Sequence, residues 1–329
     1  MPKVAILDDY AGVALRVADW ATVRNRSDVT VFDRHLSEEA AAEALRPFDV
    51  VCTLRERMAF PRTLIERLPN LKLITIVGKS LPNLDLAAAS EHGILVAHSD
   101  FAHPRFRSVR DATPELAWGL MIATVRNLAE ENRNMRDGGW QSTAGMTLSG
   151  KTLGLLGLGR VGKRMAEYAT AFGMEVVAWS QNLTEEAAAS VGARRVEKTA
   201  LFEASDVVSI HLVLSERTRG LVGASELALM KPHAYLINTS RGPIVDEVAL
   251  LAALESGRIA GAGLDVYDIE PLPGDHRLRL LRNVTLSPHL GYVTREMLGA
   301  FYSDTVESVA AWLDGTPIRI ANPEASQRR

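Results

Sequence analysis

The sequence of 329 residues predicts an α/β protein with two doubly wound parallel sheets. Short, uninterrupted apolar runs alternate with helical segments, a pattern typical of parallel strands that are covered on both faces. The alternation occurs twice, before and after a long helical pattern at 114–137. The length agrees with two domains, since one domain averages about 150 residues.

Composition narrows the classes of function. Hydrophobic residues make up 47% of the chain and charged residues 23%, as in ordinary soluble globular proteins. The net charge of -3 gives no basic field for a polyanion, which argues against a nucleic-acid partner. The single Cys52 excludes an internal disulfide and favours a cytoplasmic location. No leader or membrane span is expected, because the first apolar run ends at Asp8 and no later run reaches ~18 residues.

Strands are expected in two groups. The first group lies at 4–7, 29–32, 50–54, 71–77 and 94–97, and the second at 152–156, 175–179, 206–213, 234–238, 262–266 and 284–287. The periodic segment 294–313 predicts a terminal helix that ends before Gly315. A lone helix after a complete sheet must dock elsewhere, and a return to the first domain would make that domain discontinuous.

A glycine fingerprint joins the first strand of the second sheet to the next helix. Gly157, Gly159 and Gly162 form the pattern G-x-G-x-x-G. In a Rossmann fold the first glycine permits a tight turn, the second lets the backbone approach a pyrophosphate, and the third lets the helix pack on the strand. A glycine-rich turn without a ligand is the alternative, but the flanking strand and helix favour a dinucleotide.

The residue after the next strand bears on which dinucleotide is bound. This fingerprint expects an acidic residue about 20 positions on, where it holds the adenosine ribose. Ser180 occupies the place. Without a carboxylate NADP becomes possible, yet residues 181–184 supply no Arg or Lys, and Glu185 and Glu186 would oppose a 2′-phosphate. The sequence therefore favours NAD and leaves NADP open.

Three further segments follow the fingerprint, at 237–250, 263–271 and 287–291. With these four ordered motifs the chain resembles the D-isomer-specific 2-hydroxyacid dehydrogenases over nearly its whole length. That family includes phosphoglycerate dehydrogenase, glyoxylate and hydroxypyruvate reductases and D-lactate dehydrogenase. The resemblance implies hydride transfer between NAD(H) and C2 of a small D-2-hydroxy or 2-oxo acid, and the identity of that acid stays open.

The resemblance also implies a domain division. A discontinuous, flavodoxin-like catalytic domain would comprise 1–101 and 296–329, and a Rossmann NAD-binding domain would comprise 102–295. The active site would lie in the cleft between the two domains.

The resemblance makes Arg241, Glu270 and His289 the catalytic residues. Oxidation of a 2-hydroxy acid needs a base for the hydroxyl proton, and histidine can accept and return a proton near neutral pH. A neighbouring carboxylate such as Glu270 would orient the imidazole ring. Arg241 presents a planar fork that can hold carboxylate and carbonyl oxygens together. A turn histidine, a surface arginine and a solvated carboxylate are the alternatives for the three taken singly.

Further residues carry over as contacts to the cofactor. By resemblance the backbone of Arg160 and Val161 meets the pyrophosphate, and Thr239 and Ser240 lie beside the nicotinamide. Asp265 would hold the carboxamide, and Ser180 and His211 would line the adenosine side. A histidine packed at a strand end is the alternative for His211.

The loop that holds the substrate carboxylate in the family is altered here. Gly78 matches, whereas Lys79 and Ser80 replace the usual residues, and we expect all three to contact the carboxylate. Arg55, after the third strand, is a further candidate, with a solvated loop charge as the alternative.

Partners and competing functions follow from the same residues. In the family the helix that starts near Thr113 and Pro114 lies at a dimer interface, so a homodimer is expected, with burial inside one subunit as the alternative. No histidine or cysteine spacing suggests a metal site. An NAD(H)-sensing binding protein similar to the corepressors of this fold is the alternative to an enzyme.

Overall fold

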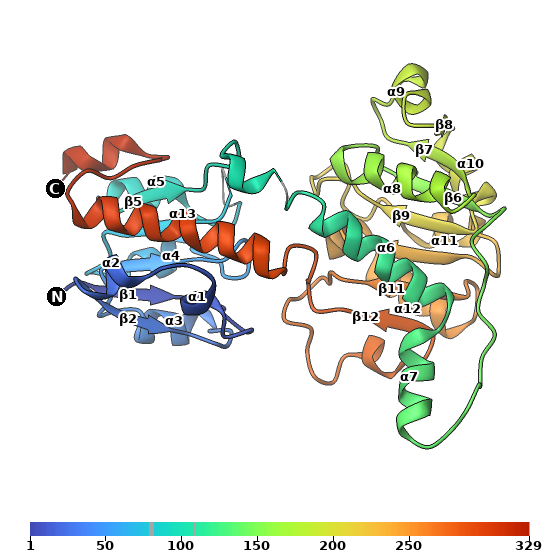
Figure 1. The fold of residues 1–329 in the computed structure, drawn as a ribbon, viewed down its shortest axis with the longest axis horizontal. Coiled ribbons are helices and arrows are strands. Elements are labelled where there is room, and N and C mark those ends of the chain that lie inside the picture. The colour runs from blue at the N-terminus through green and yellow to red at the C-terminus, as the bar shows by residue number, and fades with distance from the viewer. Residues whose placement is uncertain (79–81, 108, 329) are drawn as a thin grey trace. The chain divides into compact units, whose positions relative to one another are not determined.

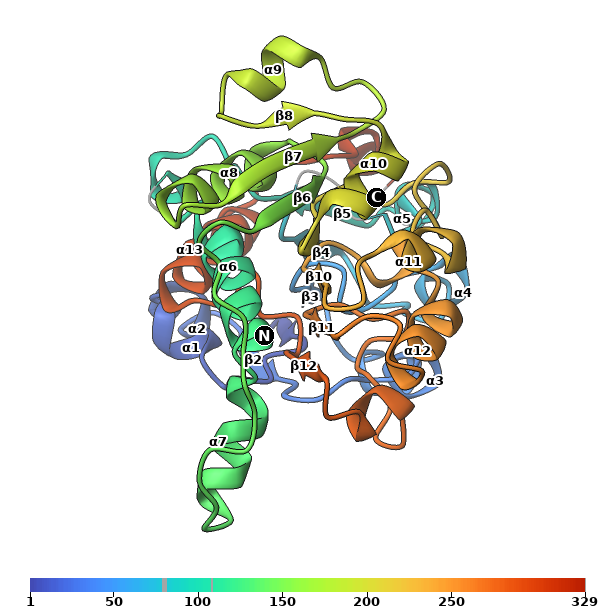
Figure 2. The ribbon, with the colours of Figure 1, turned by 90° about the vertical axis from the view of Figure 1, so that its right-hand side faces the viewer.

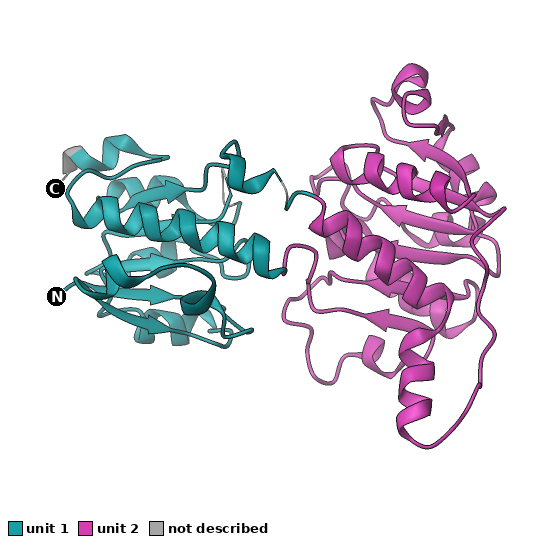
Figure 3. Ribbon diagram, viewed as in Figure 1, with its two compact units in different colours: residues 1–110, 294–329 teal, residues 111–293 magenta. Residues whose placement is uncertain are grey.

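The computed structural model describes residues 1–78, 82–107 and 109–328, which fall into two compact units. The first unit comprises Met1–Arg110 and Thr294–Arg329, and the second comprises Asp111–Val293 (Figure 3). The first part of unit 1 ends at Arg110, whereas the resemblance implies a boundary at residue 101. The reason is aromatic packing: the ring of Phe106 lies 4.8 Å from that of Phe101 and 5.8 Å from that of Phe301.

The first unit contains a parallel sheet of five strands in the order β2-β1-β3-β4-β5 (Figure 1). The strands are β1 (Lys3–Ile6), β2 (Asp28–Val31), β3 (Val50–Cys52), β4 (Leu73–Ile76) and β5 (Leu95–His98). The helices of this unit are α1 (Ala14–Val17), α2 (Ala21–Arg24), α3 (Glu38–Ala44), α4 (Arg62–Ile65), α5 (Leu86–Glu91), η1 (Pro104–Phe106), α13 (Arg295–Leu313) and η4 (Pro323–Arg328). The chain crosses from one side of β1 to the other between β2 and β3, so the topological switch point lies between β1 and β3.

The second unit contains a parallel sheet of seven strands in the order β12-β11-β10-β9-β6-β7-β8. The strands are β6 (Thr152–Leu156), β7 (Glu175–Trp179), β8 (Arg194–Arg195), β9 (Val207–Ile210), β10 (Tyr235–Asn238), β11 (Gly261–Leu264) and β12 (Val284–Leu286). The two parallel sheets confirm the predicted fold class. The apolar pattern does not predict β8, because this strand consists of two arginines.

Helices cover the second sheet. They are α6 (Ala112–Val125), α7 (Leu128–Arg136), α8 (Arg160–Ala171), α9 (Glu185–Ala189), α10 (Lys198–Ala204), α11 (Ala224–Leu229), α12 (Glu247–Glu255), and the short turns η2 (Gly242–Ile244) and η3 (Arg277–Leu280). The predicted single helix at 114–137 is wrong, because Asn127 adopts a left-handed conformation with φ 53° between α6 and α7. The first of these helices, α6, begins at Ala112, one residue before Thr113.

The terminal helix behaves as the sequence predicts. Thr294 caps α13 by accepting a hydrogen bond from the backbone N–H of Met297, 3.1 Å away. The helix packs on α1 and β4 of the first unit and buries Phe301, Tyr302 and Val309. The first unit is therefore discontinuous in sequence.

Candidate active site

The glycine fingerprint forms a tight turn between β6 and α8. Gly157 has φ 99°, and a Cβ there would lie 2.6 Å from the carbonyl oxygen of His211. A Cβ on Gly162 would lie 2.1 Å from the carbonyl oxygen of Gly157, so only glycine lets α8 approach the strand this closely. A Cβ on Gly159 would meet nothing within 4 Å. The open space at Gly159 fits a pyrophosphate at the helix N-terminus, with Arg160 as the first helical residue.

Other predicted cofactor residues follow the carboxyl ends of further strands of the same sheet. Ser180 follows β7, and His211 follows β9 with its Nε2 2.9 Å from Ser209 Oγ. Burial lowers the pKa of His211 to about 3, so the ring is neutral at physiological pH. Ser240 follows β10, and its hydroxyl donates to the carbonyl oxygen of Leu212.

Thr239, which follows β10, has a buried hydroxyl group. Its side chain is 8% exposed, and its Oγ1 has no hydrogen-bond partner among the described residues. Buried hydroxyls in proteins normally have a partner. A dinucleotide would supply one, so this orphaned hydroxyl also fits a bound cofactor.

Glu270 and His289 lie in direct contact. Glu270 Oε2 is 2.5 Å from His289 Nδ1, and Oε1 accepts a hydrogen bond from the backbone N–H of Tyr267 at 2.9 Å. Both side chains remain accessible, at 32% and 21% respectively. His289 has φ 54°, a conformation that is uncommon for a residue with a side chain and that recurs at functional sites.

Arg241 lies on the segment next to this pair. It follows β10, which is hydrogen-bonded to β11, and its Nη1 donates to the carbonyl oxygen of Ser240 at 2.7 Å. A Cβ on Gly242 would lie 2.1 Å from the carbonyl carbon of Tyr267, so the arginine segment packs directly on the loop that leads to Glu270. The three predicted catalytic residues thus follow the adjacent strands β10, β11 and β12.

Asp265 anchors the loop that carries His289. Its Oδ1 accepts hydrogen bonds from Ser287 Oγ at 2.6 Å and from the backbone N–H of Leu290 at 2.7 Å. Its Oδ2 accepts from the backbone N–H of Gly291 at 3.0 Å. Burial raises the pKa of Asp265, and these hydrogen bonds oppose that rise. The sequence assigns Asp265 to the cofactor alone and misses Ser287. The sequence feature that could have identified this pair is that Asp265 and Ser287 each lie at the carboxyl end of a predicted strand.

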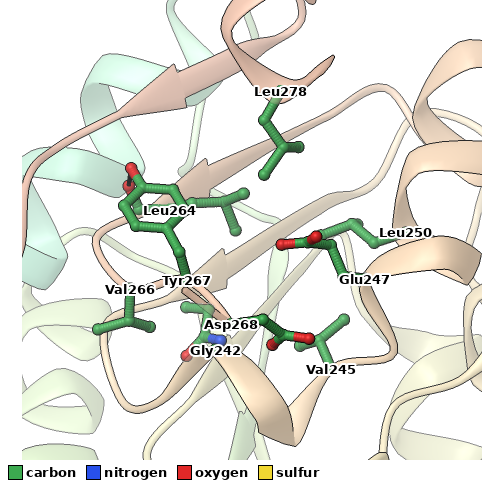
Figure 4. A pocket seen from close by; sticks show the side chains of 10 residues that line it. Gly242, Val245, Glu247, Leu250, Leu264, Val266, Tyr267, Asp268 and Leu278 are labelled. Atoms are coloured by element: carbon green, nitrogen blue, oxygen red, sulfur yellow. Dashed lines mark hydrogen bonds between the residues drawn. The ribbon is translucent and has the colours of Figure 1, made fainter. Parts of the chain in front are cut away.

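A small cavity lies behind the loop of Tyr267 (Figure 4). Its volume of about 20 Å³ holds about one water molecule, so it is too small for a 2-oxo acid. Asp268 and Glu247 line it from different elements. Burial, followed by the charge of Glu247, raises the pKa of Asp268.

The predicted substrate residues of the first unit lie near its own switch point. Arg55 has φ 57°, and its Nη1 donates to the carbonyl oxygen of Val77 at 3.3 Å, one residue before Gly78. Arg55 and Gly78 therefore lie close together. Lys79 and Ser80 lie outside the described residues.

Two classes of site are absent from the part of the chain that is described. No group of three or more His, Cys, Asp or Glu side chains could hold a metal ion. No helix in the same residues has the length and apolar character needed to cross a membrane.

The second sheet carries both a glycine turn that fits a pyrophosphate and a histidine in contact with a carboxylate. Together these features are typical of dinucleotide-dependent dehydrogenases, in which a histidine serves as acid and base. Residues 118–291 match the family model described as D-isomer specific 2-hydroxyacid dehydrogenase, NAD binding domain. The chain belongs to the D-isomer specific 2-hydroxyacid dehydrogenase family. It is an oxidoreductase that uses NAD(H) and acts on the CH–OH group of 2-hydroxy acids.

Individual relatives agree with this family. The chain is 38% identical to a glyoxylate reductase from Thermococcus litoralis, covering 77% of each chain. It is 34% identical to a hydroxypyruvate reductase from Thermotoga maritima, covering 87% of this chain and 91% of the relative. A crystal structure described as a phosphoglycerate oxidoreductase from Vibrio cholerae matches with a TM-score of 0.87 and 34% identity, covering 96% of this chain and 100% of the other. These enzyme relatives favour the oxidoreductase over the NAD(H)-sensing binding protein.

Proposed function

We propose that this enzyme reduces small, unphosphorylated 2-oxo acids of the glyoxylate and hydroxypyruvate type. The observation that carries the reduction of a 2-oxo acid is the 2.5 Å contact between Glu270 and His289, next to the segment of Arg241. The names of the relatives from Thermococcus litoralis and Thermotoga maritima support this choice of substrate.

The three residues have distinct roles in this proposal. Bound NADH supplies the hydride that C2 receives. His289 donates a proton to the oxygen on C2, and Glu270 holds the ring through Nδ1 so that Nε2 faces the substrate. Arg241 holds the substrate carboxylate and polarises the C2 carbonyl with its planar fork. In the reverse direction His289 accepts the hydroxyl proton.

The cofactor and carboxylate contacts are part of the same proposal. The backbone of Arg160 and Val161 binds the pyrophosphate of NAD(H), because both lie in the first turn of α8. Thr239, Ser240 and Asp265 hold the nicotinamide end, and Ser180 and His211 line the adenosine end. In the first unit, Arg55 and Gly78 bind the substrate carboxylate together with Lys79 and Ser80.

The test is oxidation of NADH with a panel of glyoxylate, hydroxypyruvate, pyruvate and 3-phosphohydroxypyruvate. We expect turnover of the first two, and a loss of at least about a hundredfold in kcat for His289→Ala. His276→Ala is a matched control, because His276 also pairs with a carboxylate, that of Glu247 at 3.1 Å. Preference for the phosphorylated acid, or equal turnover by folded His289→Ala and wild type, would refute the proposal.

We further propose that two copies associate through α7 and the segment that follows it. No residue of α7 is buried, and Leu128, Met135 and Trp140 are 51%, 53% and 71% exposed. Figures 1 and 2 both show α7 extending away from the rest of the second unit, with the segment after it running back toward β6. Sedimentation equilibrium tests the proposal: we expect a dimer for the wild type and a shift toward monomer for Trp140→Ser.

A cytoplasmic location is also proposed. The single thiol, Cys52, is buried, and burial raises its pKa to about 12. Burial keeps this thiol unreactive, and a sequence with one cysteine has no internal disulfide, as is usual for cytosolic proteins.

A further inference from the structure

The loop after β7 contains no basic residue of its own, but the structure brings one to it. Ser180 through Leu183 form a turn in which the backbone N–H of Leu183 donates to the carbonyl oxygen of Ser180 at 3.0 Å. This is the place where the fold holds the ribose of a dinucleotide. Because Ser180 carries no negative charge, a 2′-phosphate meets no repulsion from this position.

Arg195 reaches the turn from β8. This strand lies beside β7 (Figures 1 and 2). The pairing sets Arg195 opposite Ala178, two residues before Ser180. Arg195 Nε donates to the carbonyl oxygen of Leu183 at 3.0 Å. Two successive hydrogen bonds therefore connect Ser180, Leu183 and Arg195, and they hold a guanidinium group beside the turn that follows β7.

The surroundings of Arg195 leave it able to bind an anion. Its side chain is 31% exposed, and Nη1 has no partner among the described residues. Nη2 lies 3.0 Å from Glu197 Oε1, whose side chain is 70% exposed. An exposed ion pair of this kind contributes little, whereas a phosphate can accept charge-assisted hydrogen bonds from two guanidinium nitrogens. A phosphate can therefore displace Glu197.

We propose that Arg195 binds the 2′-phosphate of NADP(H), so that this enzyme accepts NADPH as well as NADH. Glu185 and Glu186, in the first turn of α9, and Glu197 lower the affinity by repulsion, which makes the cofactor site dual rather than specific for NADPH. The proposal concerns the cofactor alone, and it does not depend on which 2-oxo acid is reduced.

Binding titrations by calorimetry test this proposal without a turnover assay. For the wild type we expect the Kd values for NADH and NADPH to agree within about tenfold. Arg195→Ala should weaken NADPH by at least about tenfold and leave NADH within about threefold, since one charge-assisted anion contact is lost. The matched control is Arg194→Ala on the same strand, because successive side chains of a strand point to opposite faces. It should change neither Kd.

A variant that gains affinity distinguishes an effect of charge on NADPH binding from a loss of binding through misfolding. Glu197→Gln removes the competing carboxylate and should tighten NADPH by about threefold or more while NADH stays unchanged. Wild-type binding of NADPH more than about tenfold weaker than that of NADH would overturn the proposal. So would equal weakening of both nucleotides in Arg195→Ala, or an unchanged NADPH affinity in Glu197→Gln.

Discussion

Glu270 and His289 are joined by a contact of 2.5 Å between Oε2 and Nδ1, although 19 residues separate them in the chain. The second carboxylate oxygen of Glu270 is held by the backbone N–H of Tyr267. The carboxylate is thus fixed at both oxygens. Because it is fixed, its contact with Nδ1 can orient the imidazole ring.

Glu270→Gln should lower kcat by about ten- to a hundredfold with little change in stability. The amide keeps the size of the side chain but replaces a charge-assisted hydrogen bond to the ring with a weaker neutral one, so the ring is held less firmly. Glu247→Gln is the control, since it changes the other histidine–carboxylate pair, to His276, in the same unit. Steady-state kinetics and thermal unfolding of both variants check the prediction. Equal kinetic losses in the two variants would contradict it.

Asp265→Asn should destabilise the loop that carries His289. Both oxygens of Asp265 accept hydrogen bonds. In the asparagine variant an NH₂ group replaces one of these oxygens, so a donor would face the N–H or O–H donors of the loop. We expect a loss of about 1–3 kcal/mol in the free energy of unfolding of the second unit. Ser287→Ala removes a single donor and should cost about 1 kcal/mol. Urea denaturation measures both, and a smaller effect for Asp265→Asn than for Ser287→Ala would count against the anchoring role.

The glycines of the fingerprint should separate folding from cofactor binding. Gly159→Ala adds a Cβ that meets no atom within 4 Å, so the fold should tolerate it, but the Cβ enters the space of the pyrophosphate. NADH affinity should fall by at least about tenfold. Gly162→Ala places a Cβ 2.1 Å from the carbonyl oxygen of Gly157 and should lower the unfolding temperature. The expectation fails if Gly159→Ala binds NADH as tightly as the wild type.

The segment after α7 should loosen in acid. The carboxylate of Glu131 accepts hydrogen bonds from the hydroxyl and backbone N–H of Thr143, both at 2.6 Å, and from Ser142. These bonds lower the pKa of Glu131 from 4.5 to about 2. A lowered carboxyl pKa means that the stabilisation is present above pH 4.5 and is lost as the pH falls toward 2.

Hydrogen exchange of residues 137–147, corrected for the intrinsic rate, measures this loosening. Protection in the wild type should decrease as the pH falls below 4.5, whereas Glu131→Gln should show low protection at every pH. Full protection of the segment in Glu131→Gln at neutral pH would show that the carboxylate does not hold it.

Sequence periodicity predicted most of the helices and strands. It failed for one helix break and for one short strand. The strands of both sheets are predictable because buried parallel strands are continuous apolar runs. The break between α6 and α7 is not, because asparagine occurs inside helices as well as in left-handed turns, so Asn127 alone does not mark a helix end. The strand β8 is also invisible to an apolar pattern, since its pairing with β7 rather than its composition makes it a strand.

The sequence by itself determined the two α/β sheets and the glycine fingerprint, since these depend on residue type and local order. Through the family resemblance it also predicts Arg241, Glu270 and His289 as the catalytic residues. Tertiary structure alone decided which distant groups meet. Both oxygens of Asp265 accept hydrogen bonds from the loop of His289. Arg195 donates a hydrogen bond to a turn whose own residues carry no positive charge. The physical reason is that the order of strands in a parallel sheet sets which strand ends are neighbours, and spacing along the chain does not encode that order.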